Sequence, residues 1–161
     1  MYKRQQWLDT GTNTWLDVTS PDNVLISGRL ANSAVASVHI GAIPFAGSGY
    51  RMEIYGRDGT LVATSKDSPQ LSEVFLHGTK GDNALTPMPV PERFTFAAPG
   101  TPPGEAINVA QMYTLFAQAI KNRAIRDGES RQPTFETAVE LHRLVDAIKH
   151  ASDNGRQVTF E

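Results

Sequence analysis

The feature that most constrains the fold is a period-two alternation of apolar and polar residues between Thr12 and His77, broken at short intervals by turn residues. Successive side chains of a β-strand point to opposite faces, so this alternation indicates strands with one buried face. Turn residues between the runs favour hairpins and therefore antiparallel neighbours. We expect strands at Thr14–Thr19, Asn23–Leu30, Ala34–Ala42, Tyr50–Tyr55, Thr60–Lys66 and Glu73–Leu76.

Three of the intervening segments are predicted to be turns. Asn32 and Ser33 provide a short turn after the second strand, and Asp58 with Gly59 can adopt the positive φ values that a two-residue hairpin loop needs. The segment Gly47–Tyr50, "GSGY", has two glycines of a phosphate-binding loop, but such a loop leads into the N-terminus of a helix. Here it leads into a strand, which favours a turn.

The second half of the chain has a different pattern. Six prolines between Thr86 and Gly104 remove backbone donors, so we predict an irregular connection there. Residues 105–122 and 133–155 then carry apolar residues at helical spacing, which predicts two helices. Thr134 can cap the second helix, and Asn154 with Gly155 suits its end. We expect a short last strand at Gln157–Phe160.

The direction of the side chains narrows the architecture. Met52 and Ile54 share one face of their strand, whereas Arg51, Glu53 and Tyr55 share the other. One face of the sheet is thus apolar and the other is mixed. Two helices suffice to cover the apolar face, which predicts an α+β fold: an open, mostly antiparallel sheet with helices packed on one face. The mixed face suits a partner surface and a solvated surface equally well.

Length and charge exclude several classes of protein. The 161 residues fit a single domain, 1–161, with a hydrophobic core. The net charge of -2 provides no basic surface for nucleic acid. No run reaches the length of a membrane span, and we expect no membrane partner. The absence of cysteine suits the reducing cytoplasm, where we expect the protein to reside.

Few side chains are candidates for chemistry. The four histidines are dispersed without metal-ligand spacing, so we expect no metal site. Asp146 and His150 stand four residues apart on the second helix, and a solvated pair is the favoured interpretation. His39 lies mid-strand on the mixed face, where it can contact a ligand or partner, although a structural histidine is favoured. Arg51, Glu53 and Tyr55 form either a cross-strand charge network or an interface patch.

Three segments together resemble the C-terminal domain of the Gfo/Idh/MocA family of NAD(P)-dependent oxidoreductases. That family has a strand ending in I-x-G-x-x-G-x-L, a helix of the type F-x-x-A-I and a helix that begins P-S-F-x-x-A. The matching residues here are Ile54, Gly56, Gly59 and Leu61; Phe116, Ala119 and Ile120; and Pro133, Thr134, Phe135 and Ala138, with Thr134 in place of serine. The resemblance extends from about residue 14 to residue 158.

The resemblance implies a domain that packs beside a Rossmann domain, with the second face of its sheet used for oligomer contacts. Hydride would pass between NAD or NADP and a sugar or related polyol, aided by an E-K-P lysine and the histidine of a D-x-x-x-H segment. The sequence has no G-x-G-x-x-G and no E-K-P, and Asp146 with His150 lie at the wrong end of the chain for the D-x-x-x-H role. We therefore expect a partial C-terminal domain with no catalytic and no cofactor-binding residue, from a parent oxidoreductase whose Rossmann domain is missing here.

Three functions follow from these observations. The favoured one is a domain fragment of a sugar- or polyol-type oxidoreductase that contributes substrate-side surface and oligomerisation, is inactive alone and forms a homo-oligomer through the sheet face. The second is a non-catalytic, sugar-responsive transcriptional co-regulator of the same fold. The third is a free-standing small ligand-binding module. The substrate or interface candidates are His39, Arg51, Glu53 and Tyr55.

Overall fold

The computed structural model describes residues 6–42, 46–81, 83–122 and 132–160. These residues divide into two compact units, one of residues 1–46 with 135–161 and one of residues 47–134, and each is described by itself. The first unit contains β1 (Gln6–Asp9), β2 (Thr14–Asp17), β3 (Asn23–Arg29), β4 (Val35–Gly41) and α2 (Phe135–Asn154). The second contains β5 (Tyr50–Tyr55), β6 (Gly59–Ser65), β7 (Val74–Lys80), β8 (Thr86–Met88), the short 3-10 helix η1 (Glu92–Phe94) and α1 (Glu105–Asn122).

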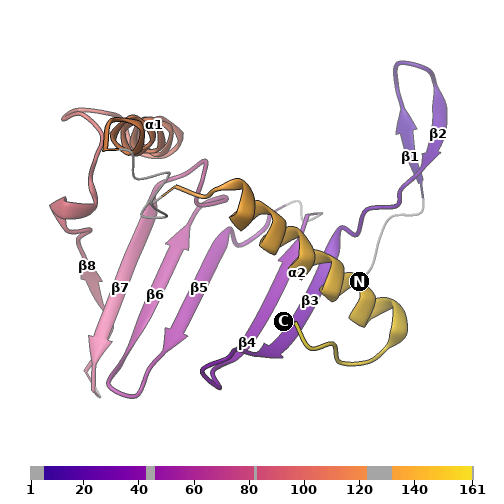
Figure 1. Ribbon diagram of the computed structural model, residues 1–161, viewed down its shortest axis with the longest axis horizontal. Helices are drawn as coiled ribbons and strands as arrows, with labels where there is room; N and C mark the ends of the chain where they lie inside the picture. The colour runs from indigo at the N-terminus through magenta and orange to yellow at the C-terminus, as the bar shows by residue number, and fades with distance from the viewer. Residues whose placement is uncertain (1–5, 43–45, 82, 123–131, 161) are drawn as a thin grey trace. The chain divides into compact units, whose positions relative to one another are not determined.

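The strands pair as antiparallel neighbours throughout the described ranges, and with the two helices they confirm the α+β class. The hydrogen-bonded strands form three sheets: β1 with β2, β3 with β4, and β5-β6-β7-β8 in that order (Figure 1). The single open sheet and the single domain 1–161 are not tested by this pairing and stay predictions. The use of one sheet face for oligomer contacts also stays a prediction.

The four-stranded sheet is built on the hairpin of β5 and β6. Gly56 N donates to Gly59 O at 2.8 Å, which closes the loop around Arg57 and Asp58. The predicted positive φ values at Asp58 and Gly59 are wrong, because neither residue is among those with positive φ. Gly59 is needed for another reason: a β-carbon there would lie 2.1 Å from the carbonyl oxygen of Thr79 on the neighbouring strand.

The hairpin of β3 and β4 confirms the other predicted turn. Leu30 N donates to Ala34 O at 2.8 Å, and Ser33 takes a φ of 68° between them. The side chain of Asn32 accepts a hydrogen bond from Ala34 N at 3.1 Å. An asparagine side chain that mimics a backbone turn in this way is a common reason for its place in tight loops.

Two regular elements lie where a connection was predicted. β8 and η1 fall within the proline-rich segment, so the prediction that it holds no element is wrong. Pro87 is tolerated because β8 is the outer strand of its sheet, where one side of the backbone needs no ladder partner. β7 also continues past Leu76 to Lys80, since its second half pairs with the first half of β6.

The beginning and the end of the chain also differ from expectation. β1 was not predicted, and it pairs with β2 so that Trp7 lies opposite Leu16 and Leu8 opposite Trp15. The predicted strand Gln157–Phe160 is wrong, because residues 157–160 lie outside any strand. A strand exists only where a neighbour offers unpaired backbone groups, and none of the described strands pairs with this segment.

Both helices have glycine at a boundary. α1 begins after Gly104, whose φ is 84° and whose carbonyl accepts from Asn108 N at 3.2 Å. The side chain of Asn108 then donates to Pro69 O at 3.0 Å and Gln70 O at 3.1 Å, which ties α1 to the loop between β6 and β7. At the end of α2, Gly155 has a φ of 61° and Arg156 N donates to Ala151 O, as in a Schellman motif. The predicted end of this helix is confirmed.

The buried core of the described residues is small. The buried apolar residues are Val62, Ala63 and Ala119, and the one buried polar residue is Ser65. Ala119 belongs to the predicted apolar stripe of α1, whereas the described residues of α2 include none that is buried. Large apolar side chains thus remain exposed on sheets and helices alike.

Candidate functional site

The polar side chains of β5 form the candidate site. Arg51, Glu53 and Tyr55 alternate along the strand and so share one face. The Nε of Arg51 donates to Oε1 of Glu53 at 2.9 Å, and its Nη2 donates to the same oxygen. The hydroxyl of Tyr55 donates to the other oxygen, Oε2, at 2.8 Å. One carboxylate thus bridges a guanidinium and a phenol along a single strand.

The hydrogen bonds set the charge state of this cluster. The hydrogen bond from Tyr55, followed by the one from Arg51, holds the pKa of Glu53 below its ordinary value of 4.5. The hydrogen bond to the Glu53 carboxylate raises the pKa of Tyr55 above its ordinary value of 10.0. Efficient general acid or base catalysis needs a group that titrates near the working pH. Both shifts move away from neutrality, so the Glu53 carboxylate is ionised and the Tyr55 hydroxyl is protonated at neutral pH.

Neighbouring strands extend the cluster into a face. The strand register places Glu53 opposite Val62 of β6, and Val62 opposite His77 of β7. Val62 is only 4% exposed, whereas Tyr55 is 74% and Phe75 is 52% exposed. We call this surface the Glu53 face, and its members are Arg51, Glu53, Tyr55, Thr60, Val62, Thr64, Phe75, His77 and Thr79. On this face Val62 is buried, and the aromatic rings of Tyr55 and Phe75 are exposed.

His39 has a local partner in the other unit. Its Nε2 lies 2.9 Å from Oδ1 of Asn23, across the hairpin of β3 and β4. This contact matches the favoured interpretation of a hydrogen-bonded structural histidine. The structure joins Arg51, Glu53 and Tyr55 by hydrogen bonds, and it assigns His39 to a separate pair. His39 as a substrate or interface residue stays a prediction.

Sequence reasoning found the three β5 residues but not their bonding. It left open a cross-strand charge network or an interface patch, and the structure shows a network that runs along one strand. The i, i+2 spacing was the available signal, because same-face neighbours of opposite charge can reach each other. The role of Asn108 as a link between α1 and a distant loop was missed, since the sequence carries no signal of which carbonyls it meets.

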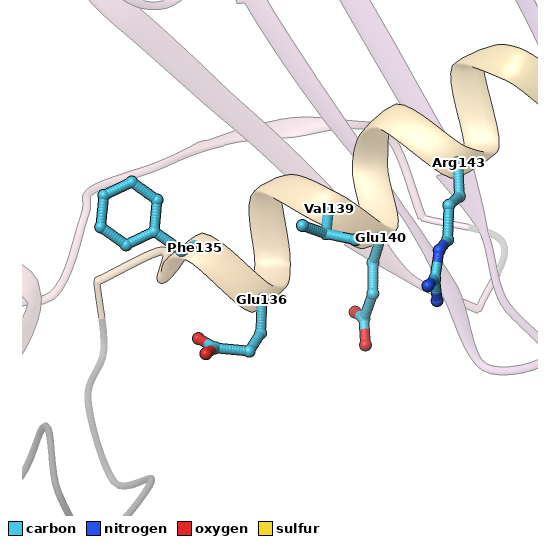
Figure 2. Close-up of a pocket in the computed structure, with 5 residues that line it drawn as sticks. All are labelled: Phe135, Glu136, Val139, Glu140 and Arg143. Atoms are coloured by element: carbon cyan, nitrogen blue, oxygen red, sulfur yellow. The ribbon is translucent and has the colours of Figure 1, made fainter.

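A second, shallow surface lies on α2. A hollow of about 330 Å³ is lined by Phe135, Glu136, Val139, Glu140 and Arg143. Figure 2 shows the charged side chains of Glu136, Glu140 and Arg143 extending from the same side of the helix. All five lining residues belong to one helix, which is convex, whereas ligand sites are concave and bury most of their ligand. This hollow is therefore not a candidate substrate site.

The glycine-rich segment Gly47–Tyr50 leads into β5, and its assignment as a turn stays a prediction. Gly49 has a φ of 77° and leads directly into the strand, not into a helix. Within the described ranges, no group of three or more histidine, aspartate or glutamate side chains could hold a metal ion. Neither described helix combines the length and the apolar character needed to cross a lipid bilayer.

His150 lies beside Asn154 in the structure, and the solvated pair with Asp146 stays a prediction. Among the described residues, no hydrogen bond joins it to Asp146; its Nδ1 lies instead 3.2 Å from Nδ2 of Asn154, one turn further along α2. Asn154 Nδ2 also donates to the carbonyl oxygen of His150 at 2.8 Å.

Comparison with known proteins gives the family. Residues 4–160 match the model described as "Oxidoreductase family, C-terminal alpha/beta domain" of Gfo/Idh/MocA proteins. Comparisons with curated proteins and with solved structures gave no match. The family match spans nearly the whole sequence and agrees with the α+β strands and helices described above. The chain therefore belongs to the Gfo/Idh/MocA oxidoreductase family, and its residues correspond to the C-terminal domain of that family.

Proposed function

We propose that this chain supplies substrate-side and oligomerisation surface to an NAD(P)-dependent oxidoreductase of sugars or related polyols, and that it is not itself catalytic. NAD or NADP would be held by a Rossmann domain of the parent protein. Membership of the family supports the oxidoreductase class. The substrate class comes from the resemblance alone, and a cytoplasmic location fits a chain without cysteine.

The Glu53 face is the observation that carries the proposal. Centres of protein interfaces are poor in net charge and rich in tyrosine, phenylalanine and arginine. On this face the charges of Arg51 and Glu53 compensate each other. The rings of Tyr55 on the same strand and of Phe75 on β7 are exposed. A face without net charge can meet a second copy of itself without repulsion, as a two-fold symmetric dimer requires.

The charge state of the cluster supports a role in binding. A carboxylate that stays ionised and a phenol that stays protonated provide fixed acceptors and donors over the physiological range. Such groups fix the orientation of a partner or ligand, whereas proton transfer needs the opposite shifts.

Oligomeric state tests the proposal directly. Light scattering after size-exclusion chromatography should give a dimer or larger assembly for the chain, and Tyr55→Asp should dissociate it while the circular dichroism spectrum is retained. Tyr113→Asp is a matched control, because Tyr113 is also exposed but lies on α1. A monomer at high protein concentration, or equal dissociation by both variants, would contradict the oligomerisation role.

A cofactor-binding experiment tests the proposal that NAD or NADP is held by a separate domain. Equilibrium dialysis with NAD⁺ and NADP⁺ should show no saturable uptake by this chain. Saturable binding of either dinucleotide would overturn the assignment of the cofactor to a separate domain.

A further inference from the structure

The end of α2 carries a reactive pair that takes no part in the proposed function. Asn154 is the last residue of the helix and Gly155 follows it, and no other Asn-Gly pair occurs in the sequence. Both residues are exposed. The backbone nitrogen of the residue after an asparagine can attack the side-chain amide carbon. Glycine obstructs this approach least, because it has no β-carbon.

The surroundings of Gly155 leave room for that attack. Apart from its two chain neighbours, no described residue has an atom within 4 Å of the position that a β-carbon on Gly155 would occupy. The hydrogen bond from Arg156 N to Ala151 O, at 3.3 Å, is longer than the usual range for N–H···O bonds. Helix ends fray, and a long closing bond favours fraying here. The attack requires the backbone at this junction to leave the geometry of the helix end, and opening a terminal turn costs less free energy than opening the interior of a helix.

His150 holds the amide nitrogen that would leave. Asn154 Nδ2 donates to the backbone oxygen of His150 at 2.8 Å and lies 3.2 Å from the imidazole Nδ1. Imidazole is the side chain that exchanges protons near neutral pH without further activation. In this contact the amide nitrogen can only donate, so the imidazole Nδ1 is the acceptor. Once attack makes Cγ tetrahedral, the nitrogen becomes a basic amine, which can take a proton from the protonated imidazole beside it.

We propose that Asn154 is a site of spontaneous deamidation and that His150 assists it by protonating the departing nitrogen. The Gly155 nitrogen loses its proton to solvent and bonds to Cγ of Asn154. The Cγ–Nδ2 bond then breaks, its electron pair stays with nitrogen, and the nitrogen takes a proton from His150 and leaves as ammonia. Water opens the resulting imide at either carbonyl, which gives aspartate or isoaspartate at position 154. The net change is hydrolysis of the amide, with no oxidant or reductant.

Other asparagines lack this combination. Asn32 precedes Ser33, whose β-carbon obstructs the approach, and its Oδ1 is engaged by Ala34 N at 3.1 Å. Asn108 lies inside α1 with its amide bound to two carbonyl oxygens. Asn32 therefore serves as an internal reference within the same molecule.

The product should weaken the helix end. Deamidation replaces the donor to the His150 carbonyl by a carboxylate, and it adds negative charge where the helix dipole is already negative. Hydrogen exchange of the last turn of α2 should be faster in the modified chains than in the unmodified ones.

Peptide mass spectrometry tests the proposal on the full chain. After incubation at neutral pH, digestion should show amide loss at Asn154 well ahead of loss at Asn32 in the same sample. His150→Gln should slow the loss at Asn154 several-fold. His142→Gln is the matched control, because His142 lies on the same helix with its Nδ1 2.8 Å from Ala138 O, and it should leave the rate unchanged.

Two results would overturn the proposal. Deamidation at Asn154 no faster than at Asn32 would show that Asn154 is not a preferred site. An unchanged rate of deamidation in His150→Gln would show that the imidazole does not assist. Measuring wild type and His150→Gln again in denaturant separates the reactivity of the Asn-Gly pair from the assistance by His150. The difference between the two proteins should vanish once the helix is unfolded.

Discussion

Met88 packs across Gly78 on the adjacent strand, and its Sδ lies 2.1 Å from the point where a β-carbon on Gly78 would stand. The space above Gly78 is thus filled by the side chain of β8, the outer strand. Gly78→Ala should force Met88 to another rotamer and lower the free energy of unfolding by about 1 kcal/mol, as overpacking does.

A double-mutant cycle checks this contact. In a Met88→Ala background, Gly78→Ala should become neutral or stabilising, because alanine restricts the unfolded chain more than glycine does. Denaturant unfolding of the four proteins gives the coupling. Additive effects of the two substitutions would show that Met88 does not occupy the space.

Gly49→Ala should be among the most damaging single changes. Gly49 has a φ of 77°, and a β-carbon there would lie 2.3 Å from Ser65 O and 2.4 Å from Lys66 O. Backbone atoms cannot move aside as a side-chain end can, so we expect a loss of about 3 kcal/mol from strain and clash together. Gly100→Ala is the matched control, with a φ of 81° and, apart from its chain neighbours, no atom of a described residue within 4 Å of the added β-carbon. It should cost only about 1 kcal/mol in thermal or urea unfolding, from the positive φ.

Ser65→Ala should leave stability unchanged or raise it by up to about 1 kcal/mol, because an unpaired buried hydroxyl costs free energy. Ser65 is buried, and its Oγ has no hydrogen-bond partner among the described residues. The midpoint of urea unfolding measures the effect. A clear loss of stability would reveal a partner for the hydroxyl.

Tyr55→Phe should reduce stability only within a window of pH. The pKa of Glu53 is lowered in the folded chain, so its contribution is present above the ordinary value of 4.5 and is lost as pH falls through the folded pKa. The pKa of Tyr55 is raised, so its contribution is present below 10.0 and is lost as pH rises through the folded pKa. The difference between wild type and variant should therefore be greatest between these limits.

Urea unfolding at a series of pH values measures this difference. Tyr113→Phe, on the exposed surface of α1, should show no such window. A constant difference between wild type and Tyr55→Phe at every pH would mean that the hydroxyl does not bind the carboxylate.

Local signals predicted the parts of the fold that depend on neighbours in sequence. The strand Tyr50–Tyr55 and the two helices follow from alternation, helical spacing and end residues, and the structure has them where expected. β8 was missed because Pro87 is a poor strand residue in isolation, and only its pairing opposite His77 makes it part of the sheet. The predicted positive φ at the Asp58 turn was wrong. Gly59 is required because a β-carbon there would collide with the backbone of Thr79, and the sequence of the hairpin does not indicate that this third strand lies so close.

The sequence predicted which residues form the candidate site but not which hydrogen bonds join them. Alternation places Arg51, Glu53 and Tyr55 on one face, whatever the rest of the fold. Which oxygen each donor meets depends on side-chain rotamers that the sequence does not specify. The directions of the Glu53 and Tyr55 pKa shifts, which follow from these hydrogen bonds, therefore needed the structure.

The link from Asn108 to Pro69 bears on the order of folding. It joins residues 39 positions apart. β5 and β6 are joined by residues 56–58, and β6 and β7 by residues 66–73, so both connections are much shorter. Longer loops cost more chain entropy to close, and contacts between sequence neighbours form first. We infer that the β-meander forms early in folding and that α1 docks on the loop between β6 and β7 later. The rate of docking then depends on forming the long-range contact of Asn108, and a higher helical propensity of α1 would not increase it.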